Sequence, residues 1–290
     1  LVGMNEAFYS VIIPVYNAEA TLIESLDSVA KQSYHDFEVV IVNDGSEDDS
    51  LRLIEGWMER HAGIKSILVD QENQGLGAAR NAGIRAASGR FVALLDADDL
   101  WHEDKLADCA QYLEKEPETV VLYHPVTNFG LDREYPRRVF PVEKADDLLI
   151  KGNPLVPSAT ILRRDLPRFQ EDPRFHGAED LFLWLELLAR GHQLTYWPEG
   201  LTYYRETNGM SNRIEEHLNM VEEVYRHWHA QKLYSMWTLE KGLQRKYYEA
   251  ARFWHKRAQH DRASLYYSAA DGKSLKIMGL RFLNFLGLKA

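Results

Sequence analysis

Cysteine is almost absent from this sequence of 290 residues, in which Cys109 is the only one. An intrachain disulfide is therefore impossible, and we expect a protein of a reducing cytoplasm. Long apolar segments are missing too, because no run reaches the roughly 18 residues of a membrane-spanning helix. The N-terminus also lacks the charged and then apolar pattern of a signal peptide. These absences predict a cytoplasmic protein without a spanning helix.

Positive charge is scarce in most of the chain. The sequence holds 34 Lys and Arg against 44 Asp and Glu, a net charge of −10. Residues 1–240 carry 23 basic and 41 acidic residues, whereas residues 241–290 carry 11 basic and 3 acidic ones. An acidic main body argues against nucleic acid as a partner. The basic C-terminal region needs a separate explanation.

Glycine is missing where the first predicted strand ends. Residues 9–15 form an apolar run that predicts a buried strand, and Pro14 marks its end because proline cannot continue a central ladder. Tyr16 and Asn17 follow directly. A dinucleotide-binding turn needs glycines at this place, which argues against a Rossmann dehydrogenase.

Apolar runs and helical periodicities alternate through the first 120 residues. This alternation predicts a largely parallel central sheet with helices on both faces, an α/β fold. The expected strands are 9–15, 37–42, 64–69, 91–95, 120–123, 159–162, 193–197 and 201–205, and the expected helices are 22–30, from 49, 75–87, from 105 and 180–190. Residues 128–157 contain four prolines and predict an irregular arm with a short helix near 146–151. A helical appendage follows, with helices expected over 218–229 and 238–269.

Three carboxylates follow the strand predicted at 91–95. Asp96, Asp98 and Asp99 come within four positions, and unpaired carboxylates beside a core strand would cost several kcal/mol unless a cation or an open cleft accommodates them. The carboxyl end of a parallel strand is where an α/β sheet places its ligand. Such oxygen ligands suit Mg²⁺ or Mn²⁺ bridged to phosphates. The alternative interpretation is a charged turn that caps a helix from Lys105.

Several motifs in this order resemble those of family 2 glycosyltransferases with the GT-A fold. They are Val11-Ile12-Ile13-Pro14-Val15-Tyr16-Asn17, Val42-Asn43-Asp44-Gly45-Ser46, Asn73-Gln74-Gly75 with Gly77-Ala78-Ala79-Arg80-Asn81, Leu95-Asp96-Ala97-Asp98-Asp99, Glu179-Asp180 and Tyr204-Arg205. The set covers about residues 9–211. The resemblance implies an inverting enzyme that uses a nucleotide-diphospho-sugar. It also implies a catalytic domain over 4–212, with a nucleotide-sugar half to about 100 and an acceptor half from about 101, before a helical, basic region over 213–290.

The resemblance also implies roles for single residues. Those expected to bind the donor are Pro14, Val15, Tyr16, Asn17, Asp44, Arg80, Asp96, Ala97 and Arg205. Asp98 and Asp96 would hold Mn²⁺ or Mg²⁺, with Asp99 as an additional candidate. Local alternatives are an Asx-turn for Asp44 and a surface ion pair for Arg80. Thr207 and Asn208 stand where many relatives carry a further metal-binding histidine, so the resemblance leaves the third ligand open.

Asp180 is expected to be the general base that takes the proton of the acceptor hydroxyl, as the resemblance implies. Glu179 and His176 are candidates for the acceptor site. The local alternative is that the two acids only cap a helix, where they offset its dipole.

The implied function is transfer of a sugar, with UDP-sugar as the expected donor, to a hydroxyl of a glycan or lipid-linked acceptor in surface polysaccharide biosynthesis. One alternative is a sugar-1-phosphate nucleotidyltransferase, which needs a glycine-rich basic loop that Pro14–Asn17 do not supply. Another is a non-catalytic nucleotide-sugar binding module, which the three acids Asp96, Asp98 and Asp180 disfavour.

The C-terminal residues 273–290 combine apolar residues at helical spacing with Lys273, Lys276, Arg281 and Lys289. This pattern is typical of an amphipathic helix on an anionic membrane surface. We therefore expect a cytoplasmic protein with a peripheral contact to the inner face of the cell membrane. The alternative is that this helix packs on the catalytic domain.

Overall fold

The structure is a computed structural model that describes residues 7–130, 134–137, 139–206 and 214–270. Its contacts divide the chain into two compact units. The first unit takes the described parts of 1–143, 154–172 and 186–207, and the second takes 144–153, 173–185 and the described part of 208–290. The boundary expected at 212–213 stays a prediction.

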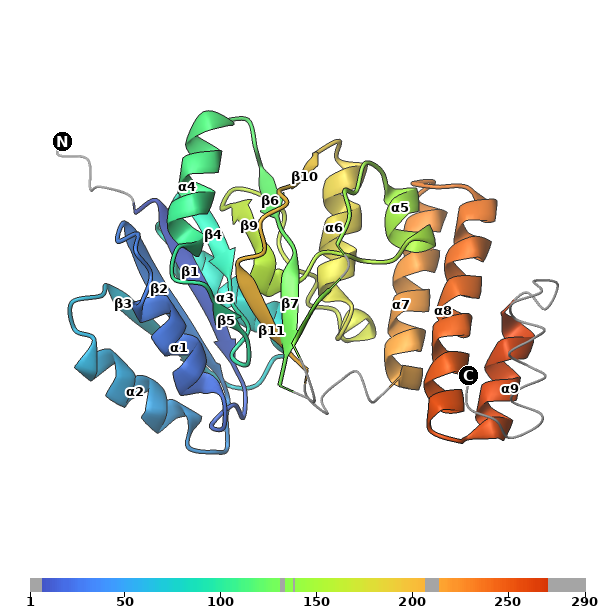
Figure 1. Ribbon diagram of the computed structural model, residues 1–290, viewed down its shortest axis with the longest axis horizontal. Helices are drawn as coiled ribbons and strands as arrows, with labels where there is room; N and C mark the ends of the chain where they lie inside the picture. Colours follow the sequence, from blue (N-terminus) through green and yellow to red (C-terminus); the bar gives the residue numbers. More distant parts are fainter. Residues whose placement is uncertain (1–6, 131–133, 138, 207–213, 271–290) are drawn as a thin grey trace. The chain divides into compact units, whose positions relative to one another are not determined.

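The first unit is built on a seven-stranded sheet with the strand order β10-β6-β9-β4-β1-β2-β3 (Figure 1). Its strands are β1 (Tyr9–Val15), β2 (Phe37–Asp44), β3 (Ser66–Gln71), β4 (Phe91–Leu94), β6 (Val121–Tyr123), β9 (Thr160–Arg163) and β10 (Leu194–Tyr196). Among them β9 is antiparallel to β4 and β6, and the other neighbours pair in parallel. The prediction of a largely parallel sheet is confirmed.

Helices cover both faces of this sheet, as predicted. Side chains alternate along a strand, so Val11 and Ile13 point to one face and Ile12 to the other. Val11 and Ile13 join a buried apolar cluster with α1 (Leu22–Ala30), α2 (Ser50–Arg60) and α4 (Lys105–Lys115). On the opposite face α3 (Leu76–Ala86) lies so close that a Cβ at Gly83 would overlap the side chain of Ile12. Small residues in α3 therefore permit close helix–sheet packing.

A second, four-stranded sheet of this unit has the order β5-β11-β7-β8. Its strands are β5 (Leu100–Trp101), β7 (Val126–Phe129), β8 (Tyr135–Pro136) and β11 (Thr202–Arg205). β11 runs antiparallel to β5, with Thr202 opposite Trp101. Because β5 follows Asp99 directly, this pairing brings the end of β11 to the acidic segment. The strands β7 and β8 lie partly in the stretch that we expected to be irregular.

The second unit is helical. It contains α5 (Ala145–Ile150), the 3₁₀ turn η2 (Pro173–Phe175), the beginning of α6 (Glu179–Ala189), α7 (Ile214–Ala230), α8 (Met236–Lys256) and α9 (His260–Ala269). The helical appendage and the short helix of the arm are confirmed. One continuous helix over 238–269 was wrong, because Ala258 has φ 57° and so breaks the helical path. The chain reverses there, and α9 packs on α8 through Ala251, Ala263 and Tyr267.

No helix within the described residues is long and apolar enough to cross a membrane. The amphipathic pattern of 273–290 lies outside the described residues, so its contact with a membrane stays a prediction.

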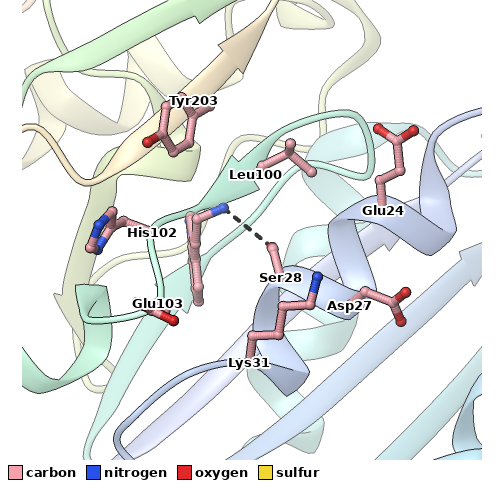
Figure 2. Close-up of a pocket in the computed structure, with 9 residues that line it drawn as sticks. Glu24, Asp27, Ser28, Lys31, Leu100, His102, Glu103 and Tyr203 are labelled. Carbon is pink, nitrogen blue, oxygen red and sulfur yellow. Dashed lines mark hydrogen bonds between the residues drawn. The ribbon is translucent and has the colours of Figure 1, made fainter.

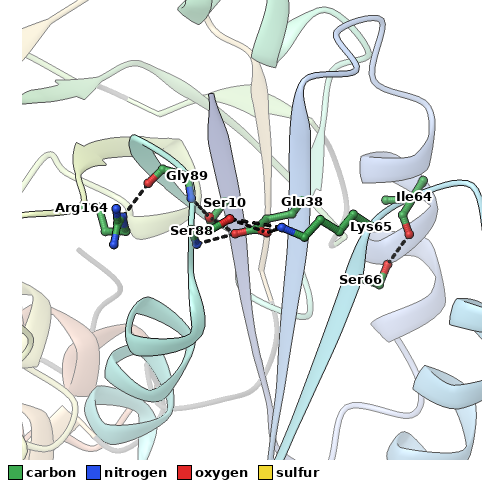
Figure 3. A network of polar contacts seen from close by, with 8 residues as sticks. All are labelled: Ser10, Glu38, Ile64, Lys65, Ser66, Ser88, Gly89 and Arg164. Atoms are coloured by element: carbon green, nitrogen blue, oxygen red, sulfur yellow. Dashed lines mark hydrogen bonds and ion pairs between the residues drawn. The ribbon is translucent and has the colours of Figure 1, made fainter. Parts of the chain in front are cut away.

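The buried carboxylate of Glu38, at the start of β2, connects neighbouring elements of the first unit (Figure 3). Glu38 accepts hydrogen bonds from Ser10 Oγ at 2.7 Å and from Ser88 Oγ at 2.8 Å, and it pairs with Lys65 Nζ. Burial by itself raises the pKa of Glu38, but the hydrogen bonds from Lys65, Ser10 and Ser88 outweigh it and lower the pKa to about 2. Glu38 therefore fastens β1, β2 and the turn before β4 at the end of the sheet away from the acidic segment.

We expect Glu38→Gln to lower the free energy of unfolding by about 2 kcal/mol, because an amide loses the ion pair and turns a donor toward other donors. The contribution of the carboxylate is present above its ordinary pKa of 4.5 and is lost as the pH falls through about 2. Urea unfolding at neutral pH and at about pH 3 should therefore give a smaller difference between the variant and the wild type under acid conditions. Glu55→Gln, on the exposed face of α2, is the matched control and should change stability by less than about 0.5 kcal/mol. Equal effects of the two variants would contradict the role of Glu38.

Candidate functional site

Polar loops follow three neighbouring parallel strands of the first unit. The strands β4, β1 and β2 lie side by side, and their carboxyl ends lead into Asp96–Asp99, Tyr16–Asn17 and Gly45–Ser46. The predicted donor-binding residues from these strands therefore gather at one edge of the sheet. This edge is where an α/β sheet places its ligand.

The loops after β1 and β2 are bonded to each other. Asn17 has φ 48°, a left-handed conformation that asparagine tolerates. Its backbone N–H donates to Ser46 Oγ at 3.1 Å, and its Oδ1 accepts from the backbone N–H of Glu47 at 2.8 Å. Tyr16 is left 52% exposed beside this link. An exposed ring on a fixed loop can pack against a planar ligand.

Asp44, at the end of β2, is buried and holds the segment before α3. Its carboxylate accepts hydrogen bonds from Gln71 Nε2 at 2.7 Å and from the backbone N–H groups of Gln74 and Gly75, each at 2.9 Å. A carboxylate offers about four lone pairs, so one acceptor position remains for a ligand. The residue is more than a local turn former, because its partners lie 27 or more positions away.

Arg80 and Asp96 form a partly buried ion pair with an N···O distance of 2.7 Å. The Arg80 side chain is 2% exposed and its guanidinium lies 5.1 Å from the ring centre of Phe169. The alternative of an exposed surface pair for Arg80 was therefore wrong, because α3 turns this side chain into the protein. The backbone N–H of Asp96 donates to Ser158 Oγ at 3.0 Å. Asp96 is thus held on both sides.

Asp98 and Asp99 have different surroundings. Burial and the neighbouring Asp96 carboxylate raise the pKa of Asp98 to about 6, against the opposite influence of Arg205 and Arg80. Asp99 is fully buried, and its Oδ1 accepts a hydrogen bond from the backbone N–H of Arg205 at 2.8 Å. Burial, Asp98 and Asp96 raise the pKa of Asp99 well above its ordinary value. The cluster therefore has a local excess of negative charge that a cation would relieve.

The donor set fits a divalent ion that takes most of its ligands from elsewhere. No group of three or more His, Cys, Asp or Glu side chains converges as a metal site within the part of the chain that the structure describes. Mg²⁺ in particular is usually bound by one or two carboxylates together with phosphate oxygens and water. Asp98 and Asp96 are the candidates for such a pair, whereas Asp99 accepts a hydrogen bond from the backbone of β11.

Arg205 ends β11 beside the acidic segment. Its Nε donates to the carbonyl oxygen of Asp98 at 2.7 Å, and its Nη2 pairs with Glu24 of α1. The guanidinium also lies 4.5 Å from the ring centre of Phe129. Glu24 and Ser158 were not predicted from the sequence, because neither belongs to a recognisable motif. Only the pairing of β11 with β5 brings Arg205 to the segment.

A cavity of about 490 Å³ borders this segment (Figure 2). Its walls come from α1, from β5 with the residues that follow it, and from β11, and they comprise Glu24, Asp27, Ser28, Lys31, Leu100, Trp101, His102, Glu103 and Tyr203. Ser28 Oγ accepts from the backbone N–H of Trp101 at 3.2 Å and so connects two of these walls. The cavity contains none of the acids of 96–99, but Glu24 belongs both to its wall and to the ion pair with Arg205.

The predicted acceptor-side residues His176, Glu179 and Asp180 lie in the second unit. Glu179 is buried, and its carboxylate accepts from the backbone N–H of Gly177 at 2.7 Å. Asp180 is half-buried at the start of α6, where Asn153 Nδ2 donates to its Oδ2 at 3.2 Å. Both acids occupy the first turn of α6, so helix capping accounts for part of their presence. The catalytic role of Asp180 stays a prediction.

A mostly parallel sheet with an acidic segment at its carboxyl edge is the architecture of the GT-A class of α/β proteins. Residues 10–168 match the family model described as Glycosyl transferase family 2. The match covers more than half of the chain, which therefore belongs to glycosyltransferase family 2.

Curated relatives are also named glycosyltransferases. The chain is 43% identical over 113 residues to the amylovoran biosynthesis glycosyltransferase AmsB of Erwinia amylovora, covering 39% of this chain and 38% of that protein. It is 27% identical over 208 residues to the putative glycosyltransferase EpsE of Bacillus subtilis, covering 70% and 75%. The chain thus matches well under half of the length of AmsB and three quarters of that of EpsE.

Solved structures of similar fold are glycosyltransferases as well. S. aureus TarS 1–349 in complex with UDP-GlcNAc has a TM-score of 0.64 and 20% identity, with 96% of this chain and 86% of that chain covered. The mannosyltransferase PcManGT of Pyrobaculum calidifontis in complex with GDP-Man and Mn²⁺ has a TM-score of 0.62 and 21% identity, with 96% and 79% covered. These likenesses confirm the GT-A fold.

Proposed function

We propose that this glycosyltransferase is an inverting, metal-dependent enzyme. It transfers a sugar from a nucleotide-diphospho-sugar, with UDP-sugar as the preferred donor, to a hydroxyl of a glycan or lipid-linked acceptor in surface polysaccharide biosynthesis. The observation that carries the proposal is the acidic segment 96–99, where a carboxylate with a raised pKa lies beside two arginines at the carboxyl edge of the sheet. An anionic leaving group with its cation suits this arrangement.

The donor is held by the loops at this edge. Tyr16 and Asn17 with Asp44 contact the nucleobase, and Pro14 and Val15 shape that loop. Ala97, with Asp96 and its partner Arg80, lies at the ribose and diphosphate. Asp98 and Asp96 would hold Mn²⁺ or Mg²⁺, which would supply positive charge to the departing diphosphate. Arg205, a forked donor, borders the phosphates.

The transfer itself is one displacement. Asp180 takes the proton of the acceptor hydroxyl while the hydroxyl oxygen forms a bond to the anomeric carbon. The bond between this carbon and the diphosphate oxygen breaks, and its electron pair leaves with the nucleoside diphosphate. A single displacement inverts the configuration, unlike a double displacement through a covalent intermediate. His176 and Glu179 belong to the acceptor side.

The named relatives support the substrate class. AmsB is named for amylovoran biosynthesis, TarS was solved with UDP and with UDP-GlcNAc, and PcManGT was solved with GDP-Man and Mn²⁺. The identities of the two structures are too low to carry over a nucleotide. Uridine is therefore our proposal, and GDP is the alternative nucleotide to compare in each binding experiment.

We expect Asp98→Ala to abolish the Mn²⁺ dependence of UDP binding, measured by titration calorimetry with and without MnCl₂. In the wild type this dependence should weaken below about pH 6, because the protonated acid is no longer a ligand. Asp165→Ala removes a carboxylate from an exposed pair with Arg163 and is the control that should leave UDP binding unchanged. Full Mn²⁺ dependence in Asp98→Ala would exclude Asp98 as the principal ligand.

We expect Asp180→Asn to lower the rate of transfer by about 10²–10⁴ while the affinity for UDP stays near that of the wild type, because the amide cannot accept the proton. The measurement is release of UDP from a UDP-sugar in the presence of an acceptor. Asp261→Asn, an exposed position of α9, is the matched control. A fully active Asp180→Asn enzyme would rule out Asp180 as the base.

We also propose a cytoplasmic location with a peripheral contact to the inner face of the cell membrane through residues 273–290, which lie outside the described residues. Their basic and apolar pattern suits an anionic lipid surface. A chain that ends at residue 272 should sediment less with anionic vesicles and still bind UDP. Neutral vesicles are the control, and equal sedimentation of both chains with anionic vesicles would contradict the contact.

A further inference from the structure

The first residue of α4 is a lysine with no exposed surface. Lys105 is fully buried, although lysine is among the residue types that proteins bury least often. An unpaired buried ammonium would be strongly unfavourable. The groups around it therefore need to be accounted for one by one.

Three acceptors surround the ammonium. Lys105 Nζ lies 2.7 Å from the carbonyl oxygen of Ser158, 3.1 Å from Thr202 Oγ1 and 3.1 Å from His124 Nε2. His124 Nδ1 lies 2.8 Å from the carbonyl oxygen of Pro125, which can only accept, so Nδ1 carries the proton and Nε2 accepts. Burial and the neighbouring Lys105 hold the pKa of His124 well below its ordinary value, which agrees with a neutral ring. All three donors of the ammonium are thus matched.

The same environment contains aromatic and acidic groups. The ammonium lies 4.4 Å from the ring centre of Trp101, a favourable cation–π contact. Burial lowers the pKa of Lys105 to about 7, whereas Cys109 and the nearby Asp99 act in the opposite direction. Lys105 is therefore a third basic side chain near the acidic segment, after Arg80 and Arg205.

Ser158 connects this lysine to the acidic segment. Its carbonyl oxygen accepts from Lys105 Nζ and also from Trp101 Nε1 at 2.8 Å and Thr202 Oγ1 at 3.1 Å. Its side-chain Oγ accepts the backbone N–H of Asp96 at 3.0 Å. Ser158 therefore accepts a hydrogen bond from Lys105 through its carbonyl oxygen and one from the acidic segment through its hydroxyl.

Thr202 makes a second connection. It begins β11, and three residues later Arg205 donates its backbone N–H to Asp99 and its Nε to the carbonyl oxygen of Asp98. The lysine therefore holds the start of the strand whose end holds the segment. Loss of the amino group would remove both connections at once.

We propose that Lys105 is a positioning residue that sets the metal-binding geometry of Asp96 and Asp98 through Ser158 and Thr202. This inference rests on the proposed function. In this role Lys105 acts through the backbone of the acidic segment and is not itself a ligand of the metal. The loops after β1 and β2, which hold the nucleobase in our proposal, make none of the Lys105 hydrogen bonds described above.

The test is binding of UDP to Lys105→Met, measured by calorimetry with and without Mn²⁺. Methionine keeps the length and apolar body of the side chain and removes its charge. We expect the affinity in the presence of Mn²⁺ to fall about tenfold or more, and the affinity without metal to change by less than about twofold. Ser158→Ala keeps the carbonyl and removes the hydroxyl, which accepts the Asp96 N–H and also interacts with Asp99. It should weaken Mn²⁺-dependent binding about fivefold with little change in melting temperature. Ser158→Ala also keeps the proposal testable if Lys105→Met does not fold.

Lys65→Met is the control. Lys65, like Lys105, has a buried partner, but that partner is Glu38 at the other end of the sheet. We expect this variant to lower the melting temperature and to leave binding unchanged. Wild-type affinity in folded Lys105→Met, or in Ser158→Ala, would overturn the inference, as would a loss in Lys65→Met of equal size. A wild-type protein that binds neither UDP nor GDP with Mn²⁺ would instead contradict the proposed function.

Discussion

The structure of the first unit depends on how it compensates the negative charge of Asp96, Asp98 and Asp99. Three carboxylates within four residues repel one another, and burial makes this repulsion stronger than it would be in water. Three basic side chains lie near these acids and offset their charge: Arg80 from α3, Arg205 from β11 and Lys105 from α4. Burial and the Asp96 carboxylate still raise the pKa of Asp98 to about 6, against the influence of Arg205 and Arg80. The negative charge of these acids would attract a divalent cation.

The two ends of β2 carry buried carboxylates with different surroundings. Glu38 at the start of β2 accepts from Ser10 Oγ, from both the backbone N–H and the hydroxyl of Ser88, and from Lys65, so no acceptor position stays open. Asp44 at the end of the same strand accepts three hydrogen bonds and keeps one acceptor position open. The hydrogen bonds of Glu38 fix the start of β2, and Asp44 at its other end can still accept from a ligand. A fixed strand supports the loops that follow it, which favours precise binding.

Local patterns predicted much of this protein. The sheet, its helices and the acidic segment follow from apolar runs and short motifs, because a buried strand and the loop after it are contiguous in the chain. The continuous helix over 238–269 was wrong because the left-handed Ala258 has no strong signal in sequence. The local alternative of a surface ion pair for Arg80 was also wrong, since helical spacing does not say which face of α3 is buried when both faces carry small residues.

Asp96, Asp98 and Asp99 lie within four positions, so the sequence by itself determined that acids would follow a buried strand. The resemblance of its motifs to those of family 2 glycosyltransferases predicted the GT-A fold. Only the tertiary structure decided which of these acids is paired, which is buried against β11 and which keeps a raised pKa. It also decided that Lys105, His124, Ser158 and Thr202 meet, although up to 97 positions separate them. The reason is physical: hydrogen bonds and charge interactions act over a few ångströms in space, and distance along the chain does not predict that separation.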